Sequence, residues 1–277
     1  MMAMMIKRVW ATLFAAAVMM FAGGGCSAIQ NLNMYSTREE VQLGNALDKE
    51  IRKQQEMLDD ARLDSFVTTR GRALIEHSRR RDIRYFFTVV NDETVNAFAI
   101  PGGYCYINLG LFRKSKTEAE LISVISHEVN HVVHQHSMKR LTQMNIVGGI
   151  TEIVVGDRGA TANLVANLLT TGGLLYYGRE AEREADYDGL VTMYEAGYDP
   201  NGMVEMFKML KAGRESEPSI WANLFSTHPM TDERIEYARR LIGQLPGKEG
   251  LIWNSPEWDG IVSYLNEKYP APEKEND

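Results

Sequence analysis

The sequence predicts an α+β fold that is mostly helical and contains a small, mostly antiparallel sheet. Apolar residues recur at helical spacing over most of the chain after Thr37, which is the pattern of amphipathic helices. Residues 84–109 differ, because β-branched and aromatic residues gather there between turn residues, as is typical of short strands. With 44% hydrophobic and 24% charged residues, the composition excludes a disordered or collagen-like chain.

Helices are expected on both sides of this central stretch, because apolar side chains there return every three or four positions among charged ones. One such segment ends in Ala196-Gly197 with Pro200 beyond, which are usual signals of a helix end. Residues 146–177 are rich in Gly, Ala, Thr and Leu, and residues 160–177 carry no charge. Their Thr and Asn residues make a membrane span a poor alternative, and we interpret this stretch as a buried helix or a mobile flap. The first expected helix begins at Thr37. Further helices are expected over residues 64–77, 117–136, 179–194, 201–212 and 232–242.

Three short strands are expected in the central stretch, over residues 85–90, 95–100 and 104–109. Asn91-Asp92-Glu93 has turn composition and separates the first two strands, and Pro101-Gly102-Gly103 stops the second. Neighbouring strands that are joined by short turns pair antiparallel. The expected sheet is therefore mostly antiparallel.

The amino terminus has the layout of an export signal. Lys7 and Arg8 precede a run of 14 residues, Val9–Ala22, with a single polar member. This run is shorter than the roughly 18–20 residues of a bilayer span, and it fits the core of a secretory signal. Three glycines and Cys26 follow, so that the whole resembles a bacterial lipoprotein signal, in which the cysteine is lipidated. Gly23 departs from that pattern, because Leu is commonest there.

These features divide the chain into four parts. Residues 1–25 are expected to be a lipoprotein-type signal peptide, 26–36 a tether, 37–268 a single domain and 269–277 a disordered tail. A cleaved soluble form and a short uncleaved anchor are the alternatives to a lipid on Cys26. With Cys26 lipidated, Cys105 has no disulfide partner, and its apolar surroundings favour a small buried side chain.

Charge and cysteine content exclude two further classes of protein. The chain has 30 basic and 37 acidic residues, a net charge of −7. This balance argues against general nucleic-acid binding, which needs a basic face. Two cysteines are too few for a disulfide scaffold.

His127-Glu128-Val129-Asn130-His131 is an H-E-x-x-H motif within the expected helix 117–136. Residues four apart share a helix face, so both imidazoles can reach one metal ion. Glu128 can hold a water on that ion and take its proton, since zinc lowers the pKa of such a water to about 7. The alternative is a pair of core or surface histidines on an ordinary helix.

A catalytic zinc needs a third protein ligand, and the candidates lie on the charged helix 179–194. Glu182 and Asp186 are four residues apart on one face, so Glu182 can bind the ion while Asp186 hydrogen-bonds a ligand histidine. Glu180 and Glu184 form a competing pair. A salt-bridged, exposed helix is the third interpretation, and spacing alone does not choose among them.

His134 and His136 follow the H-E-x-x-H motif closely. They do not complete the metzincin pattern H-E-x-x-H-x-x-G-x-x-H, because position 134 is His and position 137 is Ser. One straight helix cannot bring three side chains around an ion without strain. We therefore expect His134 and His136 to face solvent or to lie behind the metal ligands.

Besides H-E-x-x-H, the sequence contains four motifs that resemble those of a known family and occur in the same order. About fifty residues after H-E-x-x-H comes Arg179–Gly189, which is similar to R-x-x-E-x-E-A-D-x-x-G. The others are Asn96–Gly103 (N-A-F-x-x-P-G-G), Ala196–Pro200 (A-G-Y-D-P) and Ser226–Pro229 followed by Asp232–Ile235 (S-T-H-P and R-I). Over residues 37–243 the chain resembles the zinc metallopeptidases of the HtpX, LoiP and BepA group, metallopeptidase family forty-eight. Asn130 departs from the family, which usually has Gly or Ala there.

The resemblance implies a zincin-like metallopeptidase domain with one Zn²⁺ per chain and assigns roles to residues. His127, His131 and Glu182 would bind zinc, Glu128 would be the general base and then acid, and Asp186 would support a ligand histidine. His228 would be a latency plug on the metal or an oxyanion donor, and a capping or core histidine is the alternative. The edge strand beside the cleft would bind substrate as an added strand, through Asn96, Ala97, Phe98, Ala99, Ile100, Pro101 and Gly102.

The resemblance also implies a setting. The chain resembles the short LoiP type more than the repeat-bearing BepA type, and we expect a zinc endopeptidase of the bacterial cell envelope that faces the periplasm. We expect it to be lipid-anchored to a membrane, with the outer membrane favoured and the inner membrane as the alternative. Its partners would be unfolded or misassembled envelope polypeptides and the membrane, with no nucleic acid. A zinc-bearing, chaperone-like protein without hydrolysis is the alternative, and a structural zinc domain is a third. The substrate and the oligomeric state are not readable from the sequence.

Overall fold

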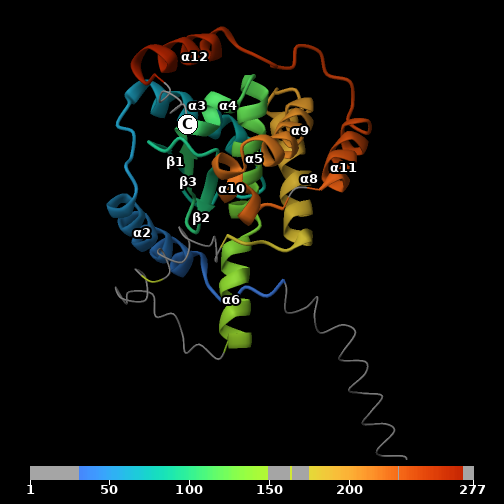
Figure 1. Cartoon of the computed structure of the whole chain (residues 1–277). Helices are drawn as coiled ribbons and strands as arrows, with labels where there is room; N and C mark the ends of the chain where they lie inside the picture. Colours follow the sequence, from blue (N-terminus) through green and yellow to red (C-terminus); the bar gives the residue numbers. More distant parts are fainter. Residues whose placement is uncertain (1–30, 149–162, 164–174, 230, 271–277) are drawn as a thin grey trace, which may run out of the picture.

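The computed structural model describes residues 31–148, 163, 175–229 and 231–270 (Figure 1). The expected signal peptide 1–25 and Cys26 lie outside the described residues. So do most of residues 146–177, for which a buried helix or a flap was expected, and residues 271–277 of the expected tail. Within the part that is described, no helix combines the length and the apolar character that crossing a bilayer requires.

The described elements confirm a mostly helical α+β fold with one small sheet. The strands are β1 (Phe86–Val90), β2 (Ala97–Ile100) and β3 (Tyr104–Asn108). The helices before and directly after the sheet are α2 (Thr37–Gln54), α3 (Ala61–Glu76), α4 (Leu109–Lys114), α5 (Glu118–Val133) and α6 (His136–Gly148). Those that follow are α8 (Arg179–Glu195), α9 (Asn201–Ser216), α10 (Pro218–Thr227), α11 (Asp232–Ile242) and α12 (Pro256–Lys268).

The prediction of a mostly antiparallel sheet needs a correction, because the sheet is mixed. Its order is β1-β3-β2, with β2 antiparallel and β1 parallel to β3. The loop between β1 and β2 passes the end of β3 and pairs with it: Asn108 N–H donates to Asn96 O, and Gly110 N–H to Asp92 O. A Cβ at Gly110 would lie 2.1 Å from Glu93 O, so glycine permits this crossing. Strand β3 is thereby inserted between the other two, and β2 is left at the edge.

Helix α5 lies at the centre of the molecule, with the sheet on one side and α8 and α9 on the other (Figure 1). Thr117 and Glu120 form a capping box at its start, which satisfies two backbone N–H groups. Almost every residue of α5 is buried, and its apolar side chains join one core cluster with those of α3, the sheet, α9 and α12. Although α5 carries several polar residues, it is buried on all sides, and this burial fixes the orientation of those residues.

The single helix expected over residues 117–136 is divided into α5 and α6. Gln135 has a φ of 55°, the left-handed conformation that non-glycine residues adopt rarely and that ends a helix. Helix α6 starts at His136 and leads away from the core (Figure 1). The break turns His136 back toward His131, and the two Nδ1 atoms are 2.7 Å apart.

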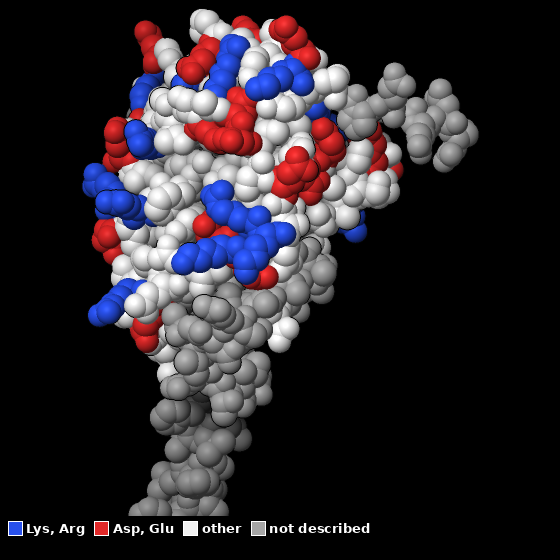
Figure 2. Space-filling model, turned by 90° about the vertical axis from the view of Figure 1, so that its left-hand side faces the viewer, with Lys and Arg blue, Asp and Glu red and all other residues white. Residues whose placement is uncertain are grey.

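On the face shown in Figure 2, Lys and Arg side chains gather in one group low on the described surface, and acidic side chains gather above it. Neither sign covers the whole face, in keeping with the moderate net charge of −7. Cys105, for which a small buried side chain was expected, is a buried free thiol, and burial raises its pKa above the usual range. It therefore has the character of a core residue and not of a reactive thiol.

Asp60 connects α12 to the start of α3. Its side chain caps α3 by accepting from the N–H groups of Arg62 and Leu63, and it also accepts from Tyr264 Oη at 2.6 Å and Lys268 Nζ at 2.8 Å. Burial opposes its ionisation, but these donors hold the pKa of Asp60 far below its usual value.

We expect Asp60→Asn to lower the free energy of unfolding by about 1.5–3 kcal/mol at pH 7, the range for hydrogen bonds to charged groups. A carboxyl whose folded pKa is lowered stabilises the fold above its unfolded pKa, about 3.9, and loses this contribution as the pH falls below it. The difference between wild type and Asp60→Asn in urea unfolding should therefore shrink between pH 5 and the acid limit of folding. A difference that does not change with pH would contradict this role of the charge.

Candidate metal centre and catalytic residues

His127 and His131 lie one turn apart on α5, and their rings meet edge to face. The two Nε2 atoms are 2.9 Å apart, and the ring planes are inclined by 78°. His127 is 6% and His131 is 2% exposed. The H-E-x-x-H spacing thus brings both imidazoles to one buried point, as expected for a shared ion.

Helix α8 brings Glu182 to the same point because it packs closely along α5. A Cβ at Gly189 would lie 3.3 Å from the backbone of His127, so glycine allows this approach. Ser126 Oγ donates to Gly189 O at 2.8 Å and ties the two helices together. Glu182 Oε2 then lies 3.5 Å from His127 Nε2, and Oε1 lies 3.5 Å from His131 Nε2.

These three residues fit a zinc ion. Zinc–ligand bonds of about 2.0–2.1 Å in a tetrahedron place the ligand atoms about 3.3–3.5 Å apart. The separations among the two imidazole nitrogens and the carboxylate are 2.9–3.5 Å. His127, His131, Glu182 and His228 form a group of buried nitrogen and oxygen donors in the described part of the chain. Two imidazoles and a carboxylate are a usual donor set of catalytic zinc.

The competition between the two carboxylate pairs on α8 is resolved by the direction of the helix. Glu182 and Asp186 face α5 and are buried, whereas Glu180 is exposed and Glu184 is partly exposed. Glu184 contacts His136 instead, with Oε2 at 3.0 Å from Nε2. The interpretation of α8 as an ordinary exposed helix is therefore wrong for this face.

Asp186 supports His127 from behind. Its Oδ1 lies 3.0 Å from His127 Nδ1, the position of an outer carboxylate that orients a metal-binding histidine. Burial alone would raise the pKa of Asp186, but the guanidinium of Arg234 beside it holds that pKa below the usual value. Asp186 is therefore ionised and acts as an acceptor.

Arg234 belongs to the R-I motif, for which the sequence predicts no role, and it lies directly behind the centre. It donates to both carboxylate oxygens of Asp186, at 2.7 and 2.8 Å, and its Nη1 lies 2.9 Å from Glu182 Oε2. It also covers the ring of Phe207 at 4.7 Å. A bidentate Arg–carboxylate pair fixes both groups. The signal for this role was an arginine four residues before Ala238 on the apolar face of α11, since a buried arginine requires acidic partners.

Glu128 is buried between the metal centre and the edge of the sheet. Its Oε2 accepts from the backbone N–H of Ala99 at 3.1 Å, and its Oε1 lies 3.3 Å from His228 Nε2. Burial raises the pKa of Glu128, while the neighbouring His228 and His127 oppose this rise. A carboxyl with a raised pKa beside a metal is suited to exchange a proton with substrate.

His228 reaches the centre from the carboxyl end of α10. Its Nδ1 lies 3.0 Å from Glu182 Oε1 and 3.3 Å from His127 Nε2, and the side chain is 5% exposed. Both distances fall within the range of 2.9–3.5 Å found among the three expected ligands. His228 therefore stands where a fourth ligand would stand, and of its two expected roles the geometry favours the plug over the oxyanion donor.

Strand β2, which contains most of the expected substrate-binding residues, is the edge strand next to the centre. Ala97, Phe98, Ala99 and Ile100 form this strand, Asn96 precedes it, and Pro101 and Gly102 make the turn to β3. Phe98 stacks on Tyr106 with ring centroids 4.8 Å apart. The N–H of Ala99 points away from β3 and toward Glu128. The edge of β2 that does not pair with β3 thus faces the Glu128 carboxylate, and all four residues of this strand are buried.

The sequence model of peptidase family M48 matches residues 61–242, which include every residue of the centre described above. The beta-barrel assembly-enhancing protease of Escherichia coli (strain K12) is 28% identical over 222 residues, 76% of this chain and 45% of that protein. The mitochondrial metalloendopeptidase OMA1 of Schizosaccharomyces pombe is 32% identical over 170 residues, 61% and 50% of the two chains. OMA1 of Arabidopsis thaliana is 29% identical over 229 residues, 82% and 45%. The chain thus spans half or less of the length of these relatives.

Proposed function

The chain belongs to peptidase family M48, a family of zinc metallopeptidases, and we propose that it is a zinc endopeptidase that hydrolyses peptide bonds in unfolded or misassembled proteins of the bacterial cell envelope. One observation carries the proposal. Glu128 lies between a buried His-His-Glu donor set and the N–H of an edge strand, so one carboxylate faces both the ion and the place of a bound peptide.

Bound zinc supplies a Lewis acid that polarises the scissile carbonyl and makes a water acidic enough to attack near neutral pH. His127, His131 and Glu182 hold the ion, and Asp186 and Arg234 keep His127 and Glu182 in place. Glu128 takes the proton of the attacking water at a carboxylate oxygen and passes it to the leaving amine.

The edge strand indicates the class of substrate. An extended polypeptide can add to β2 through backbone hydrogen bonds, which read little of the side-chain sequence. Folded proteins do not offer such a strand, so unfolded or misassembled chains are the substrates that fit. The name of one relative, a beta-barrel assembly-enhancing protease, supports an envelope setting. We place the protein at the periplasmic side of the outer membrane, anchored by a lipid on Cys26.

Removal of the metal tests the proposal. The purified protein should cleave an unfolded, reduced test protein but not its folded form, and a zinc chelator should reduce cleavage by more than about 100-fold. One equivalent of zinc added after the chelator is dialysed away should restore it. A protein that binds the unfolded chain but never cleaves it, with zinc bound, would instead be the chaperone-like alternative.

His228→Ala tests the latency role. If His228 occupies the fourth position for most of the time, its removal raises the competent fraction, and a fraction of about one tenth predicts an increase of about tenfold in basal cleavage. The zinc content should stay the same, because three protein ligands remain. Initial rates at saturating substrate measure this, and a fall in rate would assign His228 to stabilising the transition state.

A further inference from the structure

A second group of metal-binding side chains lies behind the catalytic centre. It consists of His134 and His136, on either side of the break between α5 and α6, and Glu184 on α8. Glu184 Oε2 lies 3.0 Å from His136 Nε2 and 3.8 Å from His134 Nδ1. The two rings are nearly parallel, with centroids 5.3 Å apart. The left-handed Gln135 between the histidines is what lets both face one carboxylate.

His134 lies between two carboxylates. Asp188 Oδ2 lies 2.7 Å from His134 Nε2, and Asp188 also pairs with Arg79 at 3.0 Å. Asp188 can only accept when it is ionised, so Nε2 of His134 donates to it. The other ring nitrogen, Nδ1, faces Glu184 Oε2 at 3.8 Å, a separation into which a cation would fit. Asp188 is placed as an outer carboxylate is placed behind a metal-binding histidine.

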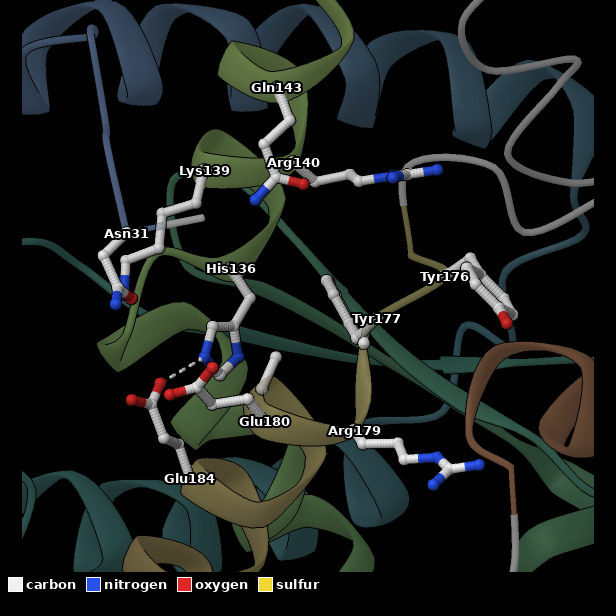
Figure 3. Close-up of a pocket in the computed structure, with 12 residues that line it drawn as sticks. Asn31, His136, Lys139, Arg140, Gln143, Tyr176, Tyr177, Arg179, Glu180 and Glu184 are labelled. Atoms are coloured by element: carbon white, nitrogen blue, oxygen red, sulfur yellow. Dashed lines mark hydrogen bonds and ion pairs between the residues drawn. The ribbon is translucent and has the colours of Figure 1, made fainter. Parts of the chain in front are cut away.

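We propose that His134, His136 and Glu184 form a second, separate site for a divalent transition metal of the zinc class. Two imidazole nitrogens and one carboxylate oxygen are a zinc donor set, and separations of 3.0 and 3.8 Å bracket the roughly 3.3–3.5 Å of a tetrahedral ion. His136 and Glu184 line a surface hollow of about 430 Å³, in which Figure 3 shows them pointing toward each other. The hollow gives the ion an entry path and leaves room for water as the fourth ligand.

The second site is connected to the catalytic centre through His131 and His136. Their Nδ1 atoms are 2.7 Å apart, so a ligand of the second site is in direct contact with a ligand of the catalytic ion. Two divalent cations held on neighbouring rings repel each other. Each ion should therefore weaken the binding of the other. Excess zinc should therefore bind second and inhibit.

Equilibrium dialysis of the full chain against excess zinc tests the proposal, with zinc per chain as the readout. We expect two ions in wild type, and one ion in His134→Ala and in Glu184→Gln. Glu180→Gln is the matched control: it removes the same charge from the same helix and the same hollow, but it lies outside the cluster, so two ions should remain. One ion in wild type, two in both cluster variants, or the loss of both ions from both variants would overturn the proposal.

Inhibition supplies a second readout, which rests on the proposed peptidase activity. Cleavage by wild type should fall at least about tenfold as zinc rises above one equivalent, whereas His134→Ala should keep its rate. Binding of two ions together with no cleavage at any zinc concentration would contradict the peptidase and leave the second site standing. Inhibition that is equal in wild type and His134→Ala would show that excess zinc acts elsewhere, and it would overturn the connection between the sites.

Discussion

Glu128→Gln is expected to lower peptide cleavage by about 10²–10⁴-fold, the range that a positioned general base contributes. Glutamine has nearly the shape of glutamate and can still accept the hydrogen bond from Ala99 N–H, but it cannot take a proton from water. The three metal ligands are untouched. The zinc content and the melting temperature should therefore stay close to those of wild type, and only the chemical step should fail.

Single-turnover cleavage of an unfolded protein, measured beside metal content, checks this expectation. The binding of the unfolded protein to Glu128→Gln should remain within a few-fold of wild type, since the edge strand is intact. Ala99 offers only a backbone group, so Ala99→Gly is a suitable control that alters the strand without removing the donor. Cleavage by Glu128→Gln at more than about a tenth of the wild-type rate would contradict the role of Glu128 as the base.

Much of the fold follows from local signals. Asp232 and Ile242 bound α11 as expected, and α2 begins at the predicted Thr37, because Ser36 and Thr231 are helix caps that act within one turn. The mixed pairing of the sheet depends on contacts between a loop and the far end of β3, which strand propensity does not encode. The break at Gln135 was missed for a similar reason, since nothing in the side chain of glutamine favours a left-handed backbone.

In the candidate site, too, some residues follow from local sequence signals and others are placed only by long-range packing. H-E-x-x-H specifies His127 and His131 because helix geometry alone puts them on one face. Glu182 could not be separated from Glu184 by spacing, because both lie on α8 and only its rotation against α5 decides which carboxylate meets the centre. That rotation comes from Gly189 packing on His127, a contact between elements about sixty residues apart. Long-range packing of this kind also places Arg234 behind the ligands. The spacing of residues along the sequence could not predict that position.

Glu182→Ala is expected to reduce zinc affinity by more than about 100-fold, beyond the range of 10–100-fold that losing an outer partner costs. The variant retains His127, His131 and the displaceable His228, and without the firm carboxylate ligand the zinc is expected to be lost during dialysis. It also leaves the buried Arg234 with Asp186 as its remaining partner, so a lower melting temperature is expected in addition.

This measurement is sharpest in a His134→Ala background, because the neighbouring cluster then cannot take up the released ion. Loaded with one equivalent of zinc and dialysed, the His134→Ala protein should keep about one ion, and the double variant with Glu182→Ala close to none. Glu180→Ala, added to the same background, is the control: it lies on α8 but is exposed, and it should keep the ion. Asp186→Ala, in the same background, should have a zinc affinity between those of these two variants, about 10–100-fold below that of the His134→Ala protein. Retention of a full equivalent by the Glu182→Ala double variant would mean that the third ligand is His228, since its Nδ1 lies 3.3 Å from His127 Nε2, and the centre would then be a three-histidine site.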